Sequence, residues 1–228
     1  MSKIKLYYDT LSQPSRALKL FLLVNKIPYE GIAVNLAKGE QLQPEYEKIN
    51  PLRKVPVLEH NGTIIRESVG ILRYLCRELD IPDHWYPKDS LQQAKVDEYL
   101  EWQHLNTRLF CAMFVHYKVL KPKFAGEPQD EKMISYTFKG MQNALDVICN
   151  VWLKDQKYLC GDKISVADLL GVCELEQPRL GGYDVSKDRP ILKAYMDRVR
   201  GDLQPHYTDV MKRFDKFLSK YGDLIAKL

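Results

Sequence analysis

Near the start of the chain stands Lys3-Ile4-Lys5-Leu6-Tyr7-Tyr8-Asp9-Thr10-Leu11-Ser12-Gln13-Pro14-Ser15-Arg16. Residues 3–8 alternate and are rich in β-forming side chains, which predicts a strand. Residues 14–26 place apolar side chains at helical spacing, and Pro14 suits a first helical turn, where its missing N–H is no loss. This sequence therefore predicts a strand, a short turn and a helix that begins close to Ser12.

The remainder of the first 79 residues adds strands and one more helix. Residues 29–36 are typical of a second strand, and Asn61-Gly62, between residues 55–59 and 63–66, predicts a β-hairpin. Residues 68–79 have the apolar spacing of a helix. The order of these elements predicts a small α/β domain over residues 1–79, with a mixed sheet covered by helices.

Strand signals nearly vanish after a segment that contains two prolines. Residues 80–89 include Pro82 and Pro87 and show no periodicity, so we expect a linker there. Helical patterns occupy residues 91–117, 130–154, 190–200 and 205–228. A further helix is expected after Ser165, because Ser165 and Asp168 have the spacing of a capping box. An all-helical domain over residues 90–228 therefore follows the α/β domain.

The composition is that of an ordinary soluble globular protein, with 45% hydrophobic and 28% charged residues. We expect no transmembrane span, and the N-terminal residues lack a signal-peptide pattern, so we expect a cytoplasmic protein. The five cysteines are scattered, and neither they nor the five histidines have metal-ligand spacing. These patterns predict neither a disulfide framework nor a metal site.

The excess of positive charge lies in the first third of the chain. Residues 1–79 contain 12 Lys or Arg against 8 Asp or Glu, whereas the remaining residues contain 22 of each sign. A nucleic-acid-binding protein would usually show a denser basic patch, so we expect no nucleic acid as a partner. The distribution suits a small anionic ligand, although chance distribution explains it equally well.

Ser12 and Ser15 occupy positions at a helix N-terminus where thioredoxin-like folds keep the two cysteines of a Cys-x-x-Cys motif. With serine at both positions, this motif cannot perform disulfide exchange. A hydroxyl donor beside the positive end of a helix is suited instead to the thiolate of a bound ligand. An equally good interpretation from this motif alone is that Ser12 only caps the helix.

Two further positions depart from ordinary strand and helix patterns. Pro56 cannot donate to a sheet ladder, so Val55-Pro56 indicates an edge, where an extended peptide can bind as an added strand. Ser68 begins the helix of residues 68–79, where its N–H and hydroxyl suit a carboxylate, and Glu67 suits an ammonium group. A plain helix cap remains the alternative for Ser68. Together with Ser12, these positions suit the parts of glutathione.

The chain resembles the theta class of cytosolic glutathione transferases, and in particular the insect-like theta type. The resemblance rests on residues 11–17, 50–56, 66–68 and 83–87, and on Val166-Ala167-Asp168. It covers nearly the whole chain in order. It implies a thioredoxin-like N-terminal domain with a cis proline, an all-helical C-terminal domain, a homodimer, and an electrophile pocket between the domains.

The resemblance also implies roles for individual residues. Ser12 would stabilise the thiolate of glutathione, the co-substrate. The glutathione-binding residues would be Gln41, Lys54, Val55, Pro56, Glu67 and Ser68. Lys54 and Val55 would hold the glycyl and cysteinyl parts, with Pro56 in the cis form, and Glu67 and Ser68 would hold the γ-glutamyl part. The electrophile pocket would include Leu11, Arg108, Phe114 and Tyr117.

Two departures from the family pattern limit these expectations. Gln41 stands where some theta enzymes have a histidine at the glycyl carboxylate, which predicts weaker binding at that end because glutamine carries no charge. The sequence stops at Leu228, soon after an amphipathic pattern, whereas some theta enzymes have a longer C-terminal extension over the site. We therefore expect a more open pocket.

The expected activity is the conjugation of glutathione to small hydrophobic electrophiles in detoxification, by attack of its thiolate on an electrophilic carbon or a peroxide oxygen. The alternatives are a non-catalytic member that binds apolar ligands or partner proteins, and a glutathione-dependent thiol–disulfide exchanger. The second alternative suffers from the absence of cysteine at positions 12 and 15.

Overall fold

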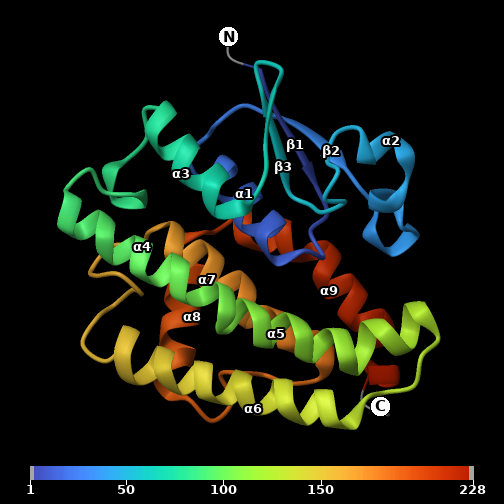
Figure 1. Ribbon diagram of the computed structural model, residues 1–228. Helices are drawn as coiled ribbons and strands as arrows, with labels where there is room; N and C mark the ends of the chain where they lie inside the picture. The colour runs from blue at the N-terminus through green and yellow to red at the C-terminus, as the bar shows by residue number, and fades with distance from the viewer. Residues whose placement is uncertain (1–2, 226–228) are drawn as a thin grey trace. The chain divides into compact units, whose positions relative to one another are not determined.

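The computed structural model describes residues 3–225, with side chains up to residue 220 (Figure 1). Its contacts divide the chain into two compact units. The first unit ends at Asp83 but also includes Leu203–Phe214, whereas the second contains His84–Asp202 and resumes at Asp215. The sequence predicts an all-helical domain over residues 90–228, whereas the contacts group Leu203–Phe214 with the first unit. Leu203–Phe214 joins the first unit because Phe214 is fully buried there, with the Arg16 guanidinium 4.6 Å from its ring centroid.

The first unit is built on a four-stranded sheet. Its strands, in spatial order, are β2 (Glu30–Ala33), β1 (Ile4–Tyr8), β3 (Val57–His60) and β4 (Thr63–Ile65). β1 pairs in parallel with β2 and antiparallel with β3, and β3 pairs antiparallel with β4. The mixed sheet predicted from the sequence is confirmed.

Helices pack against this sheet on both faces. They are α1 (Gln13–Val24), α2 (Pro44–Glu47) and α3 (Ser68–Glu78). Tyr46 of α2 clusters with Tyr7 and Val57 on one face. Successive side chains of a strand point to opposite faces, so the paired Leu6 and Leu58 face the other side. That side is covered by α1 and α3, which pack against each other (Figure 1).

Two turns of the first unit behave as the sequence predicted. Asn61 and Gly62 both have positive φ, 50° and 82°, which is the geometry of a two-residue hairpin turn between β3 and β4. The peptide bond between Val55 and Pro56 is cis. The expectation that Val55-Pro56 marks a sheet edge is wrong, because β3 pairs with β1 on one side and with β4 on the other. Pro56 is compatible with this inner strand because it lies just before Val57, where the ladder with β1 begins.

The second unit is helical in all of its longer elements. Its helices are α4 (Ser90–Leu105), α5 (Thr107–Val115), α6 (Glu131–Val147), α7 (Val166–Glu176) and α8 (Pro190–Asp202), and α9 (His206–Ile225) belongs partly to each unit. α5 and α6 continue as the π-helical segments His116–Ala125 and Ile148–Trp152. Short 3₁₀ helices occur in both units. Leu36–Lys38 and Glu40–Leu42 lie in the first unit, Asp83–Trp85 spans the boundary, and Gln177–Gly181 lies in the second unit.

The prediction of one uninterrupted helix over residues 91–117 is wrong. Asn106, with φ −120° and ψ −97°, separates α4 from α5. Its side-chain amide donates to the carbonyl oxygen of Trp102 at 2.8 Å. Asparagine side chains compete with the backbone for hydrogen bonds, which explains why the helix breaks here although the apolar spacing continues.

The predicted capping box at the start of α7 is confirmed. The N–H of Ser165 donates to Asp168 Oδ2 at 2.8 Å, and the N–H of Ala167 donates to Ser165 Oγ at 3.3 Å. Asp168 is fully buried, and its Oδ1 also accepts from the N–H of Leu159 at 2.9 Å. One carboxylate therefore caps the helix and anchors the preceding loop.

Candidate active site

Ser12 occupies the N-cap position of α1, in an extended conformation with φ −82° and ψ 126°. Its hydroxyl accepts no capping hydrogen bond from the helix. The N–H of Ser12 donates to the carbonyl oxygen of Asp9 at 2.9 Å, and its own carbonyl oxygen accepts from the N–H of Arg16 at 3.1 Å. The backbone of Ser12 is thus fixed while its half-buried hydroxyl is not used as a cap, which weakens the capping interpretation.

The turn before Ser12 is held from inside the protein by Arg16. This side chain is fully buried, and its Nη1 donates to the carbonyl oxygens of Thr10 at 3.0 Å and Leu11 at 3.3 Å. A buried guanidinium is tolerated where it is hydrogen-bonded, and these carbonyls supply such partners. Arg16 therefore links the first turn of α1 to the backbone that leads into it.

The loop before the cis proline is braced by side chains of neighbouring residues. The carbonyl oxygen of Lys54 accepts from the Tyr46 hydroxyl at 2.7 Å and from the Asn50 side-chain amide at 2.8 Å. Burial raises the pKa of Tyr46 to about 12, so its hydroxyl keeps its proton and remains a donor. Arg66 in turn donates to Asn50 Oδ1 at 3.0 Å. Lys54 itself is exposed, and Val55 is half-buried.

Glu67 precedes α3 in an unusual backbone conformation, with φ 62° and ψ 117°. A non-glycine residue at positive φ is uncommon, and such strain, which costs about 1–3 kcal/mol, concentrates at functional sites. The Glu67 side chain is exposed, whereas Ser68, the first residue of α3, is buried. Together they present a carboxylate and a helix N-terminus side by side.

Gln41 lies in the short 3₁₀ helix Glu40–Leu42. Its Oε1 is buried and has no hydrogen-bond partner among the residues that the structure describes. A buried amide oxygen without a partner is uncommon in folded proteins. Gln41 therefore has spare capacity to accept a hydrogen bond.

In the second unit, the residues predicted for the electrophile pocket have different environments. Arg108 Nη1 pairs with Glu174 Oε1 at 2.7 Å, and the Glu174 side chain is only 1% exposed. Phe114 is 3% exposed and packs against Phe138 with ring centroids 5.6 Å apart. Tyr117 is half-buried, as is Leu11 of the first unit. Phe114 is thus a core residue, and Arg108 already has an anionic partner.

Comparison with known proteins places this chain in a family. The model of the glutathione S-transferase N-terminal domain matches residues 6–83, and that of the C-terminal domain matches residues 110–202. Glutathione S-transferase theta-1 from Bos taurus is 44% identical over 196 residues, which are 86% of this chain and 82% of that protein. Glutathione S-transferase theta-1 from Homo sapiens is 40% identical over the same shares of both chains.

The chain belongs to the glutathione S-transferase family.

Solved structures agree with this membership and with the theta class. Human glutathione transferase theta-2, in complex with glutathione and an unknown ligand, has a TM-score of 0.90 at 34% identity, covering 98% of this chain and 90% of that one. A delta-class glutathione transferase from Nilaparvata lugens has a TM-score of 0.80 at 25% identity, covering 95% of this chain and 99% of that one. The chain is a glutathione transferase of the theta class, with higher identity to these vertebrate theta enzymes than to this insect enzyme.

Two residues that hold the transferase's Ser12 turn are not predicted from the sequence. They are Arg16, and Asp9, whose side chain accepts from the N–H of Leu11 at 2.9 Å. Nothing in the spacing of the motif that contains Arg16 indicates a buried guanidinium. Neither residue has a local pattern that could have identified it.

No group of three or more His, Cys, Asp or Glu side chains within residues 3–225 could hold a metal ion. Within the same part of the chain, none of the helices combines the length and apolarity needed to cross a membrane.

Proposed function

We propose that this transferase ionises bound glutathione through a hydrogen bond from the Ser12 hydroxyl and conjugates it to small hydrophobic electrophiles. The observation that carries the proposal is the hydroxyl of Ser12, which stands at the N-terminus of α1 without serving as its cap. The protein itself forms no covalent bond in this reaction. It positions the nucleophile and stabilises its charge.

The magnitudes support this role for Ser12. A free thiol has a pKa of about 8.5, and lowering that value by about 2 requires roughly 2.7 kcal/mol. A hydrogen bond to a charged acceptor contributes about 1.5–3 kcal/mol. The helix N-terminus adds about 0.3–1 kcal/mol. Together they are sufficient to keep most of the bound thiol ionised at neutral pH.

The remainder of glutathione would be held by the residues before β3 and at the start of α3. Val55 lies before Val57, the first paired residue of β3, so its backbone is outside the sheet ladder and suits the extended cysteinyl part. Glu67 would bind the γ-glutamyl ammonium group, and the N–H and hydroxyl of Ser68 would bind its carboxylate at the N-terminus of α3.

The glycyl end of glutathione would lie near Lys54 and Gln41. Lys54 is exposed and supplies the positive charge. The side-chain NH₂ group of Gln41 would donate a hydrogen bond to the glycyl carboxylate without adding charge, so weaker binding is expected at this end. We further propose that Leu11, Arg108 and Tyr117 line the electrophile pocket, with Phe114 as a packing residue.

In the conjugation, the thiolate sulfur forms a bond to the electrophilic carbon, and the leaving group departs with its bonding electron pair. With an epoxide, the C–O bond breaks and the oxygen takes a proton from water. With a hydroperoxide, sulfur attacks an oxygen, the O–O bond breaks and an alcohol leaves. A second glutathione then converts the resulting sulfenic acid to glutathione disulfide and water.

The test is to measure the consumption of glutathione with a panel of alkyl halides, epoxides and hydroperoxides. We expect at least one of these classes to be consumed faster than in the uncatalysed reaction, with the rate rising as pH increases toward the pKa of the bound thiol. If glutathione binds but no electrophile is consumed, the non-catalytic alternative is correct. A mixed disulfide between glutathione and the protein would favour thiol–disulfide exchange instead.

We also propose that the transferase is a cytoplasmic homodimer that acts without a metal. The second unit offers an apolar groove of about 420 Å³ between α5 and α6, lined in part by Phe110 and Tyr136. Tyr136 is 62% exposed, and its ring meets that of Phe110 at 6.0 Å between centroids. Gly140 permits this arrangement, because a Cβ there would collide with the Phe110 ring. Such a surface suits a second copy of the chain.

Replacing Tyr136 by lysine is therefore expected to weaken the dimer, because an ammonium group would be buried among apolar side chains. Size-exclusion chromatography with light scattering should show a dimer for the wild type and a larger monomer fraction for Tyr136→Lys at the same concentration. A suitable control is Lys132→Ala, which changes an exposed side chain of the same helix. A wild type that is monomeric at all concentrations would reject the homodimer.

A further inference from the structure

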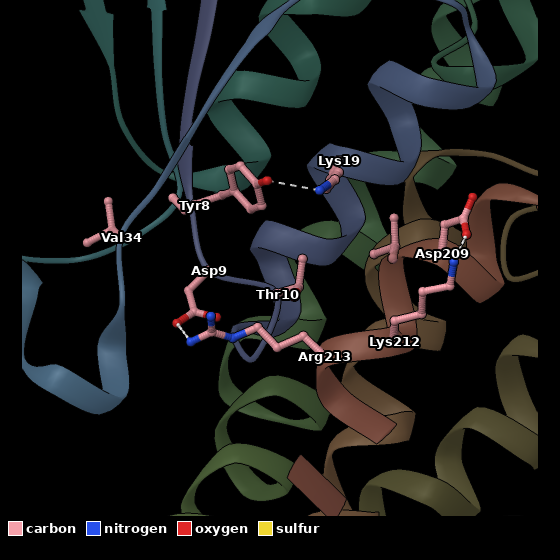
Figure 2. A pocket seen from close by; sticks show the side chains of 10 residues that line it. Tyr8, Asp9, Thr10, Lys19, Val34, Asp209, Lys212 and Arg213 are labelled. Atoms are coloured by element: carbon pink, nitrogen blue, oxygen red, sulfur yellow. Dashed lines mark hydrogen bonds and ion pairs between the residues drawn. The ribbon is translucent and has the colours of Figure 1, made fainter. Parts of the chain in front are cut away.

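The side chain of Asp9, at the end of β1, is a buried hub of hydrogen bonds. It is 1% exposed. Its Oδ1 accepts from the N–H of Leu11 at 2.9 Å, and its Oδ2 accepts from the N–H of Leu36 at 3.0 Å. Oδ2 also accepts from Nη2 of Arg213 at 2.9 Å, an ion pair that is visible in Figure 2. This carboxylate therefore joins the turn before Ser12 to a residue 204 positions later in the chain.

Arg213 reaches this hub from α9. Its Nη2 also donates to Asn35 Oδ1 at 3.2 Å, so one guanidinium group holds the segments that follow β1 and β2. The next residue, Phe214, is fully buried under the guanidinium of Arg16. Arg16 in turn binds the carbonyl oxygens of the same turn. Two adjacent residues of α9 thus support the turn of residues 9–12 along separate routes.

We propose that Arg213 and Asp9 form a positioning pair that fixes the Ser12 hydroxyl where it can donate to the sulfur of bound glutathione. The inference rests on the proposed function of Ser12. It adds that the geometry of the catalytic turn depends on α9, through an ion pair to a residue three positions before the serine.

The physical reason lies in the unequal burial of the two partners. Asp9 is 1% exposed, whereas the Arg213 side chain is 43% exposed. Without Arg213, the buried carboxylate would keep its backbone donors but lose the cation with which it pairs, an arrangement that is unfavourable in a protein interior. The turn would then relax toward conformations that bring Asp9 to water. Because Asp9 also accepts the Ser12 N–H through its carbonyl oxygen, Ser12 would move with it.

Charged groups next to the pair provide a matched control. A cavity of about 210 Å³ beside it is lined by Tyr8 of β1, Lys19 of α1, and Asp209 and Lys212 of α9, among others (Figure 2). Lys212 pairs with Asp209 at 2.6 Å, and its side chain is 72% exposed. Lys212 therefore shares the helix, the charge and the cavity with Arg213.

Two further groups complete the surroundings of the pair. Glu40 accepts from the N–H of Asn35 at 2.7 Å, and Lys19 donates to the Tyr8 hydroxyl at 2.9 Å. Arg16 faces the turn from α1. The substitutions below leave all of these side chains in place. A change in the pH profile of thiol ionisation would therefore report on the Asp9–Arg213 pair itself.

The experiment compares Arg213→Ala, Arg213→Lys, Asp9→Asn and the control Lys212→Ala with the wild type. It measures the ionisation of bound glutathione against pH by the ultraviolet absorbance of the thiolate, kcat and KM for glutathione, and the thermal unfolding midpoint. Arg213→Ala and Asp9→Asn are expected to move thiol ionisation to higher pH and to lower kcat about tenfold at neutral pH. The reason is that the hydrogen bond from the Ser12 hydroxyl to the thiolate would be partly lost. Arg213→Lys should recover part of the effect, and Lys212→Ala should match the wild type.

Three outcomes would overturn the inference. The first is a folded Arg213→Ala variant with the pH profile and kcat of the wild type; if that variant does not fold, the profile of Arg213→Lys decides in the same way. The second is a lower unfolding midpoint with no change in the profile, which would make the pair purely structural. The third is that Arg213→Ala shifts thiol ionisation as far in the Ser12→Ala background as in the wild type, which would show that the pair does not act through Ser12. If Ser12→Ala alone leaves thiol ionisation unchanged, the proposed function of Ser12 fails instead.

Discussion

Replacement of Ser12 by alanine is expected to slow the conjugation of glutathione at neutral pH by roughly ten- to a thousand-fold. The variant loses a hydrogen bond to the thiolate, so a smaller fraction of bound glutathione is ionised. The loss should shrink above the pKa of a free thiol, about 8.5, where glutathione ionises without help. The measurement is kcat/KM against pH with one electrophile that the wild type consumes.

Ser15→Ala is the matched control for this substitution. Ser15 lies three residues later on α1, and its Oγ is buried without a hydrogen-bond partner in the described part of the chain. Removing that hydroxyl should leave the pH profile unchanged, since it serves neither the helix nor the ligand in this proposal. Equal rates for Ser12→Ala and the wild type at neutral pH would show that the role given to Ser12 is wrong.

Replacement of Asp168 by alanine is expected to lower the free energy of unfolding of the second unit by at least about 3 kcal/mol. Three buried donors would lose their acceptor, namely the N–H groups of Leu159 and Ser165 and the Ser165 hydroxyl, and each loss costs about 1–3 kcal/mol. Urea unfolding followed by far-ultraviolet circular dichroism measures the change. The control is Asp162→Ala, an exposed acid of the same loop, which should stay within about 0.5 kcal/mol of the wild type.

Asp168 also makes stability depend on pH. Burial, which outweighs its hydrogen bonds, raises the pKa of Asp168 from the ordinary 3.8 to about 6. Between these values the folded state binds more protons than the unfolded chain, so stability falls as pH rises from about 4 to about 6, by roughly 3 kcal/mol. In Asp168→Asn this part of the fall should be absent. An identical pH dependence in both proteins would contradict the raised pKa.

Local patterns were sufficient to predict much of this fold. The Asn61-Gly62 turn, the helix near Ser12 and the capping box of Ser165 and Asp168 each depend on a few consecutive residues. The tertiary contacts favour the same backbone conformations as these local sequences do. The break at Asn106 was not predicted, because apolar spacing continues across it and only the competing side-chain hydrogen bond stops the helix.

The supports of the candidate site could not be predicted in this way. Arg16 is buried, although arginine usually lies at the surface. Asp9 pairs with Arg213, which lies 204 positions later in the sequence. The positive φ of Glu67 is likewise imposed by its surroundings, because glutamate has no intrinsic preference for it. Sequence patterns thus predict candidate glutathione-binding side chains, but not the contacts that hold those side chains in place.

The membership of Leu203–Phe214 in the first unit has a consequence for anyone who recombines such enzymes. A chimaera joined once, near Asp83, would combine the sheet of one parent with the α9 segment of another. In such a chimaera, the Arg16 guanidinium would pack against the other parent's residue in place of Phe214. The Asp9 carboxylate would likewise face the other parent's residue in place of Arg213. Exchanging the first unit of this chain intact therefore takes three crossovers, so that residues 203–214 are exchanged together with the sheet.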